Sequence, residues 1–359
     1  MKCKLQILIA LITFSVFSCS DDETKNREAD IKSFSFTSDI QVSEAMTDDK
    51  ISIIVRNTDV SRLTPTIELS EGASVVPASG VTQDFSKSVK YTVTSEDGRS
   101  SKVYIVSVVL ITESETAIKI TYNFEDWGES GTSFKHPALN DIMWQSANGA
   151  IALAKVGNVE EYPTGPTTDA YSGNYAAQMK TLEGGTFFGH KITIFSGSLF
   201  RGKFELNTSE VLKSIKFGQI HPKEFGKPKN FSGYYKYTPG KTFTSPNGDI
   251  AGVTDEFSLY AVMFKVSKGT TGQIEYLNGD NVLSSDKVVA TAILEDKTPK
   301  SEFTPFSIDF TYKQELNYNQ YDYKVALVFA SSADGDNYRG AIGSTLIVDD
   351  VVLECTPIK

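Results

Sequence analysis

Short runs in which apolar and polar residues alternate recur along almost the whole chain, and this period of two most constrains the fold. Such alternation is typical of strands that bury one face. Examples are "IKSFSF", "KISIIV" and "TPTIEL", and "VKYTVTSEDGRSSKVYIVSVV" adds two runs around an Asp97-Gly98 turn, a strong hairpin signal. Only "SEVLKSIKF" could form a helix, and its β-branched residues weaken that reading. The pattern therefore predicts an all-β protein.

The length and the turn signals predict two domains. Residues 31–112 contain only strand patterns and predict an N-terminal immunoglobulin-like β-sandwich that serves as a spacer. The polar stretch "ITESETA" (111–117) reads as a short linker. Residues 118–359 alternate strand patterns with turn clusters such as "SPNGD", "LNGDN" and "SADGDN", which predicts a larger β-jelly-roll sandwich.

The first residues are typical of an export signal. Residues 1–18 carry two lysines and an apolar run that is too short for a typical membrane-spanning helix, and small residues precede Cys19. "VFSC" resembles a bacterial lipobox with Cys19 as the lipidated residue, and "SDDE" resembles the export tag of Bacteroidetes surface lipoproteins. We predict a signal peptide (1–18), a flexible polar tether (19–30) and an outer-membrane lipoprotein exposed on the cell surface. The alternative is an ordinary cleaved signal with an incidental cysteine.

The net charge and the number of cysteines limit the classes of partner and of covalent or metal cross-link that this chain can have. The formal net charge is −10 and becomes −12 when the signal removes Lys2 and Lys4. A chain this acidic is a poor candidate for nucleic acid or for anionic lipid headgroups, so the predicted membrane contact is the lipid on Cys19. Once Cys3 is removed and Cys19 lipidated, only Cys355 remains, which excludes an intrachain disulfide and argues against a cysteine-based zinc site.

The closing stretch "TLIVDDVVL" (345–353) reads as a buried strand that contains two adjacent carboxylates. Strict alternation puts Asp349 and Asp350 on opposite faces, each apolar otherwise. Because an unpaired buried carboxylate is costly, each should have a compensating partner. At the other end of the domain, "IKITYNFEDW" alternates with Ile118 and Ile120 inward, and Glu125 ends its polar face.

These two strands resemble the first and last strands of jelly-roll carbohydrate-binding modules. The shared motifs are Asn123-Phe124-Glu125, "SGNYAA" (172–177) and "VDDV" (348–351). The resemblance implies a structural Ca²⁺ held by Glu125, Asp349 and backbone carbonyls near Asn174, a ligand set that suits this ion. The alternative is that both carboxylates accept backbone N–H groups at a sheet edge.

A second resemblance spans about residues 118–355. The stretches that carry it are "FEDW", "TDAYSGNYAAQMKT", "FSGSLFRGKF", "KFGQIHPKEFGKPKNFSGYYKYTPG" and "FASSADGDNYRGAIGSTLIVDDVVL". In this order they resemble the putative carbohydrate metabolism domain family of Bacteroidetes lipoproteins. That resemblance implies an immunoglobulin-like domain followed by a jelly roll with a candidate sugar pocket, but no established reaction.

The stretch "GYYKYTPG" (233–240) is the densest aromatic segment. Alternation places Tyr234 and Lys236 on one face and Tyr235 and Tyr237 on the other, which we expect in the core. Aromatic rings stack on the C–H face of a sugar, and charged groups bind its hydroxyls. The predicted carbohydrate-binding residues are His221, Tyr234 and Lys236, followed by Trp144, Tyr338 and Arg339.

The sequence analysis predicts a glycan-binding surface lipoprotein and leaves two alternatives open. One is a glycoside hydrolase or lyase, which needs two carboxylates across a cleft. Acidic residues lie in several predicted loops, but no pair is distinguished: Asp126, Glu183, Glu224, Asp255 and Asp336. The other is a structural or adhesive protein. Neither a nucleophile elbow nor a glycine-rich nucleotide loop is present.

Overall fold

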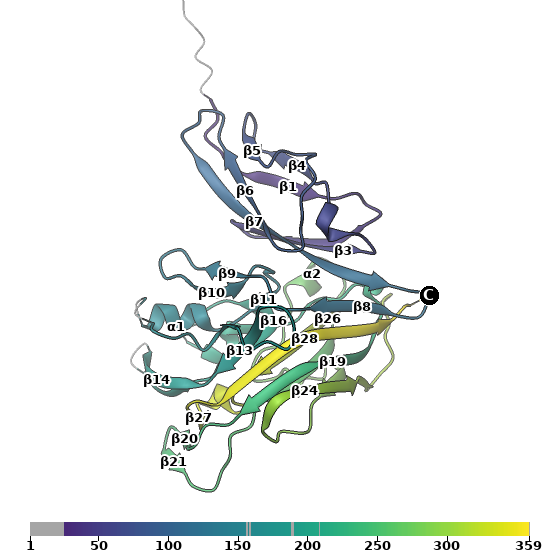
Figure 1. Ribbon diagram of the computed structural model, residues 1–359. Coiled ribbons are helices and arrows are strands. Elements are labelled where there is room, and N and C mark those ends of the chain that lie inside the picture. The colour runs from purple at the N-terminus through teal and green to yellow at the C-terminus, as the bar shows by residue number, and fades with distance from the viewer. Residues whose placement is uncertain (1–24, 156, 158, 188–189, 208, 359) are drawn as a thin grey trace, which may run out of the picture.

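The computed structural model describes residues 25–358 except 156, 158, 188, 189 and 208. The predicted signal peptide and Cys19 lie outside the described residues. Two β-rich domains follow one another along the chain (Figure 1), and the predicted all-β class is confirmed. Among the described residues, no helix has the length and apolar composition needed to cross a bilayer.

The N-terminal domain is a small sandwich around its own core. Strands β1 and β4 form one sheet, and the other contains β2, β3, β5, β6 and β7, with β3 and β7 parallel. Phe34, Phe85 and Tyr91 pack edge to face between them. The strands are β1 (Ile31–Ser35), β2 (Gln41–Met46), β3 (Lys50–Arg56), β4 (Thr66–Leu69), β5 (Ser74–Val76), β6 (Val89–Thr94) and β7 (Ser101–Glu113), with the 3-10 turn η1 (Val60–Arg62).

The C-terminal domain packs two larger sheets face to face. We call them the closing sheet and the hollow sheet. The closing sheet contains β8 (Ile118–Tyr122), β12 (Thr164–Thr167), β13 (Ala176–Lys180), β19 (Lys227–Thr238), β24 (Lys300–Asp309) and β28 (Thr345–Thr356). The hollow sheet contains β11 (Trp144–Gln145), β16 (Ser198–Phe204), β17 (Ile215–Phe217), β18 (Gln219–Ile220), β22 (Ser258–Ser267), β23 (Val288–Ile293), β25 (Thr311–Tyr312) and β26 (Tyr321–Ala330). The main core fills the space between them, because Tyr235 and Val348 of the closing sheet meet Leu259 and Phe329 of the hollow sheet there.

Hairpins and short helices surround this sandwich. They are β9 (Trp127–Ser130), β10 (His136–Leu139), β14 (Leu182–Phe187), β15 (His190–Phe195), β20 (Phe243–Ser245), β21 (Gly248–Ile250), β27 (Gly340–Ala341), α1 (Asn148–Ala154), α2 (Thr270–Gln273), η2 (Val211–Ser214), η3 (Lys223–Phe225) and η4 (Gly335–Asn337). The sequence pattern did not predict α1. "SEVLKSIKF", whose β-branched residues weakened the helix interpretation, forms the single turn η2 and strand β17.

The two domains are joined by a shared sheet and not by a loose linker. Strand β7 runs into β8 through the four residues 114–117, and the two pair antiparallel, with Ile111 opposite Ile120. Hydrogen bonds cross the junction as well. Asp126 accepts from the Ser88 amide at 3.1 Å and from its hydroxyl at 3.0 Å. The Ser52 hydroxyl accepts from the Ile142 amide at 3.0 Å.

The sequence pattern predicts strict alternation along β28, but the structure departs from it. Leu346 and Val348 face the core, but so do Val351 and Leu353, so the inward parity changes between them. The pairing with β19 shifts register at this point, and Asp350 adopts a left-handed φ of 45°. A β-bulge therefore lies at Asp350–Val351, opposite Gly233 of β19, and lets both halves of the strand bury apolar side chains on one face.

Candidate functional site

The six predicted sugar-binding residues fall in three separate places. His221 and Trp144 belong to the interior, with 3% and 4% of their surfaces exposed. His221 Nε2 lies 2.8 Å from the Gly226 carbonyl oxygen, and burial lowers the pKa of this histidine to about 4. The neutral ring therefore donates to that carbonyl. Trp144 stacks on Phe329, with ring centroids 5.9 Å apart. Neither side chain is open to a ligand in this conformation.

Tyr234 and Lys236 lie on the outer face of the closing sheet. Tyr235 and Tyr237 point the other way and are 2% and 1% exposed, as the alternation predicted. Tyr234 and Lys236 are therefore accessible, but the thickness of the closing sheet separates them from the main core.

Tyr338 and Arg339 lie in the loop between β26 and β27. Tyr338 lines a hollow on the outer face of the hollow sheet. Arg339 pairs with Asp334 at 3.1 Å, and its guanidinium lies 5.8 Å from the centre of the Phe243 ring. Of the six predicted residues, only Tyr338 is among those that line this hollow.

The hollow has a volume of about 340 Å³, within the range of small-molecule sites. Strands β16, β22 and β26 form its floor, and α1, β15 and the loops 279–284 and 333–338 form its walls. Most of the lining is apolar, including Ile151, Ile194, Phe200, Phe204, Phe217, Tyr260, Val282, Leu283 and Val328.

The sequence of the floor strands explains why a hollow forms there. In β22, Leu259 and Ala261 face the main core, while Tyr260 and Val262 face outward. Both faces are apolar, so the outer face also needs a cover. The loops and α1 supply that cover incompletely, and the uncovered part is the hollow.

Polar side chains also line this mostly apolar site. Asp336 of η4 and Asp280 of the α2–β23 loop line it together with Tyr260 and Tyr338. Asp336 is exposed to solvent although it lines the hollow. The pKa of Asp336 is raised by desolvation and, to a smaller extent, by the charges of Asp280 and Asp334.

The charge of Asp336 affects the pKa of both Tyr260 and Tyr338. Burial first, and then the Asp336 charge, raise the pKa of both Tyr260 and Tyr338, so both hydroxyls stay protonated and able to donate at neutral pH. Tyr338 also has a left-handed φ of 57°, a strained conformation for a tyrosine. Strain of this kind concentrates at functional sites.

A buried carboxylate fixes the loop that carries Asp336 and Tyr338. Asp255 is 1% exposed, and its Oδ2 accepts hydrogen bonds from the Ser332 hydroxyl at 2.6 Å, the Ala341 amide at 2.7 Å and the Ser344 hydroxyl at 2.7 Å. These contacts hold both ends of the loop against the sandwich. Asp255 is therefore a positioning residue rather than part of the hollow.

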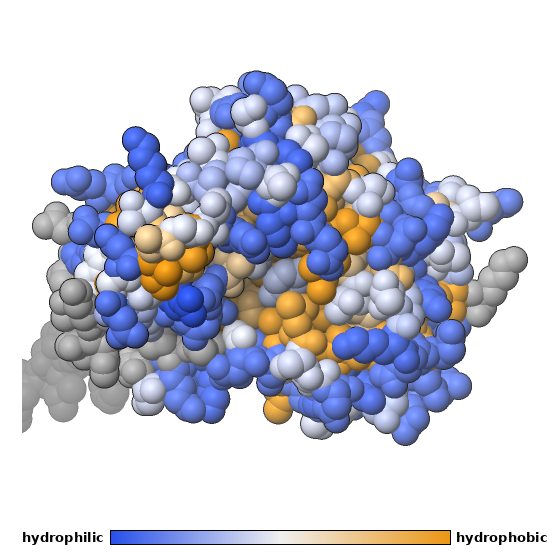
Figure 2. All heavy atoms as spheres, turned by 90° about the horizontal axis from the view of Figure 1, so that it is seen from below, coloured by the Kyte–Doolittle hydropathy of each residue, from blue (hydrophilic) through white to orange (hydrophobic). Residues whose placement is uncertain are grey.

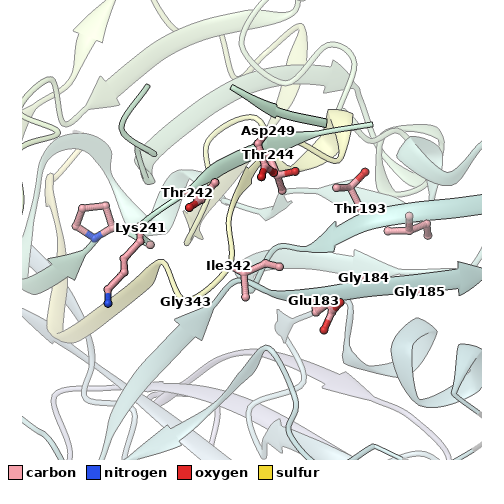
Figure 3. Close-up of a pocket in the computed structure, with 13 residues that line it drawn as sticks. Glu183, Gly184, Gly185, Thr193, Lys241, Thr242, Thr244, Asp249, Ile342 and Gly343 are labelled. Carbon is pink, nitrogen blue, oxygen red and sulfur yellow. The ribbon is translucent and has the colours of Figure 1, made fainter. Parts of the chain in front are cut away.

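A broader groove of about 970 Å³ lies beside the hollow, and Ile192 lines both. In Figure 3, Glu183 and Thr193 come from the β14–β15 hairpin, Thr244 and Asp249 from β20 and β21, and Lys241 extends away from them. No aromatic side chain is among the described residues that line it. Figure 2 shows the face of the C-terminal domain that is turned away from the N-terminal domain, where apolar patches and polar residues surround a depression.

The other loop carboxylates of the sequence analysis have different surroundings. Glu183 lines the groove, Asp126 binds across the domain junction, and Glu224 lies in η3. Asp336 is the one of the five that lines the hollow. Its companions Asp280 and Tyr260 had no distinguishing pattern in the sequence, since "LNGDN" reads as an ordinary turn and Tyr260 as a core residue.

Glu125 and Asp349 both bind the loop 171–175. Asp349 Oδ2 accepts from the amides of Tyr171 and Ser172 at 2.9 and 3.1 Å. Glu125 Oε1 accepts from the amides of Asn174 and Tyr175 at 2.7 and 2.9 Å. These contacts correspond to the amide-binding alternative for the two carboxylates.

Calcium binding at Glu125 and Asp349 stays a prediction. A bound ion would have to compete with these N–H groups for the same carboxylate oxygens. Across the described part of the chain, no group of three or more His, Cys, Asp or Glu residues is arranged to hold a metal ion.

Comparison with known families covers both domains. Residues 121–354 match the model of the family described as "putative carbohydrate metabolism domain". The chain belongs to this family. Residues 31–108 match the model described as "SGBP, N-terminal", a domain of surface glycan-binding proteins. The predicted family resemblance is confirmed, and the protein is carbohydrate-related, with an N-terminal domain that supports a surface or extracellular location.

Two solved structures from Bacteroides species are similar along the chain. One, from Bacteroides thetaiotaomicron VPI-5482, is described as a putative glycoside hydrolase. It is 30% identical, covers 92% of this chain and 98% of its own, and has a TM-score of 0.58. Another putative glycoside hydrolase, from Bacteroides vulgatus ATCC 8482, is 27% identical, covers 66% of this chain and 97% of its own, and has a TM-score of 0.55. No curated protein matches this chain.

Proposed function

We propose that this member of the family binds glycan in the hollow on the outer face of the hollow sheet. The observation that carries the proposal is the combination of an apolar floor with two tyrosine hydroxyls and two carboxylates in about 340 Å³. A pyranose ring has an apolar C–H face and a rim of hydroxyls, so it needs apolar contact and hydrogen-bonding groups within one small site. The groove next to the hollow has room for further sugar units of a chain.

The proposal also gives the protein a place in the cell. The lipobox-like "VFSC" at Cys19 would attach it to the outer membrane, and the N-terminal domain would act as a spacer. Because β7 and β8 share a sheet, the spacer and the glycan-binding domain would move as one unit. The match of residues 31–108 to a domain of surface glycan-binding proteins supports this arrangement.

Hydrolysis of the bound glycan is a second candidate. Glycoside hydrolases pair a carboxyl group of raised pKa, which acts as the acid, with an ionised carboxylate. Asp336 has a raised pKa and lines the same hollow as Asp280. The two solved relatives described as putative glycoside hydrolases add support.

A glycan array probed with residues 20–359 tests the proposal, followed by analysis of reducing ends released from each hit. A binder retains its ligand unchanged. An enzyme releases reducing ends and loses this activity in Asp336→Asn, while the control variant Glu224→Gln, in η3 and outside the lining of the hollow, keeps it. Failure to bind any glycan on the array would contradict both and favour the structural or adhesive alternative.

A further inference from the structure

A cluster of aromatic and charged side chains lies on the outer face of the closing sheet, away from the hollow. We call it the tyrosine platform, and it consists of Tyr171, Tyr234, Phe303, Lys236 and Asp169. Tyr234 alternates along β19 with Tyr235, which faces the main core, whereas Tyr260 alternates with Leu259 of the same core. The platform and the hollow therefore lie on opposite outer faces of the sandwich.

The rings of the platform are stacked in layers. Tyr171 lies on Tyr234, with ring centroids 3.5 Å apart and planes 13° from parallel. Phe303 meets Tyr171 edge to face, with centroids 5.9 Å apart. Tyr171 is 46% exposed although it is large and partly apolar. One face of its ring is covered by Tyr234, and nearly half of the residue stays exposed to solvent.

Charged groups border these rings. Lys236 Nζ lies 4.9 Å from the centre of the Phe303 ring and pairs with both Asp169 oxygens at 3.0 and 2.9 Å. The Asp169 side chain is 51% exposed. The platform thus combines an exposed ring face with a hydrogen-bonding donor and acceptor at its edge.

Two carboxylates hold the loop that carries Tyr171 through its backbone amides. The fully buried carboxylate of Asp349 and the carboxylate of Glu125 accept hydrogen bonds from four backbone amides of residues 171–175. Gly173, with φ of +65°, makes the turn between the two pairs, and a Cβ there would lie 2.1 Å from Glu125 Oε1. The ring is therefore held in place before any ligand arrives, which lowers the entropic cost of binding.

We infer that the tyrosine platform is a second carbohydrate-binding surface, on which the C–H face of a pyranose unit stacks on Tyr171 while Lys236 and Asp169 bind its hydroxyls. This site is flat and open, in contrast to the hollow, so it suits an internal unit of a polysaccharide chain. A protein partner is the competing occupant. The rigid loop, the exposed tyrosine ring and the polar border favour the saccharide.

Affinity gel electrophoresis of residues 20–359 tests the inference, with galactomannan, xyloglucan, arabinoxylan and polygalacturonate as soluble probes. In Tyr171→Ala we expect about tenfold weaker binding to each probe that retards the parent, because aromatic anchors commonly contribute this much. Tyr171→Phe keeps the ring and should bind like the parent. Lys236→Met keeps all the rings and should lose a few-fold through the polar border alone.

Tyr338→Ala, in the hollow, separates the two proposals. If only Tyr338→Ala loses binding, the platform is wrong and the hollow stands. If only Tyr171→Ala loses binding, the hollow is wrong and the platform stands. Parent-like binding by both Tyr171→Ala and Lys236→Met, or no binding of the parent to any of the four probes, would overturn the inference. Melting temperatures of all variants check that each has folded.

Discussion

Replacement of Asp349 by asparagine tests the account of the closing strand. The fully buried carboxylate accepts three backbone N–H groups, from Tyr171 at 2.9 Å, Ser172 at 3.1 Å and Asp350 at 2.8 Å. An asparagine side chain has one acceptor oxygen, so at least one of these N–H groups would face an NH₂ group. We therefore expect the C-terminal domain to lose stability.

The magnitude follows from the number of bonds affected. Leaving one buried donor without an acceptor costs about 1–3 kcal/mol, and the remaining bonds lose the strengthening that a charged acceptor provides. Removal of the buried charge offsets part of this loss. We expect a net loss of about 2 kcal/mol in the free energy of unfolding.

The assay is urea denaturation followed by tryptophan fluorescence. Both tryptophans, Trp127 and Trp144, lie in the C-terminal domain, so the signal reports on that domain. Asp350→Asn is the matched control, since asparagine tolerates the left-handed φ of 45° at that position, and we expect a change within about 0.5 kcal/mol. Equal effects of the two substitutions would refute the reasoning.

The pH dependence gives an independent check. Desolvation raises the pKa of Asp349 above its usual value despite the amide bonds that oppose this. Between the unfolded and the folded pKa the native state binds more protons, so this group contributes more stability as the pH falls through that window. The gap between the parent and Asp349→Asn should therefore widen on acidification. A gap that narrows would contradict the raised pKa.

Three further predictions concern other parts of the molecule. The pKa of His221 is about 4 in the folded state, below its unfolded value, so the protein should lose about 2 kcal/mol of stability as the pH falls from 7 to 5. This loss should disappear in His221→Gln. The same pH profile for the parent and the variant would contradict a buried neutral ring. Gly173→Ala forces a left-handed alanine against Glu125 and should destabilise the C-terminal domain by about 1–2 kcal/mol in the same urea assay. Gly252→Ala, in the same domain with a similar φ of +76° and open space around it, shows the cost of the backbone alone. Since Glu125 and Asp349 already accept amide hydrogen bonds, the melting temperature should be the same in EDTA as in calcium; a calcium-dependent rise would instead support the calcium prediction.

The alternation of residues determined much of the fold. It correctly placed Tyr235 and Tyr237 in the core and Tyr234 and Lys236 on the surface, because each strand has one buried face. It was wrong for β28, where the bulge at Asp350–Val351 changes which residues face the core. The position of the bulge depends on how β28 pairs with β19. This contact joins segments far apart in the sequence, so the local pattern of residues does not predict it.

The site was less predictable for a related reason. His221 was expected at a sugar pocket from its neighbours in the sequence, but it lies in the interior, where its ring donates to a nearby carbonyl. The residues that line the hollow come from loops and strands far apart in the sequence, such as Asp280 and Asp336, and nothing in either turn marks them as neighbours. Of the six predicted sugar-binding residues, Tyr338 alone lines the hollow, and it belongs to a motif that carries the family resemblance.

A crystal structure of residues 20–359 with a bound oligosaccharide tests the central claim most directly, with the ligand taken from the strongest hit on the glycan array. The account predicts electron density for a sugar ring on the floor of the hollow, in contact with Tyr260 and Tyr338 and within hydrogen-bonding distance of Asp336. An oligosaccharide bound elsewhere on the domain, with the hollow filled only by water, would contradict it.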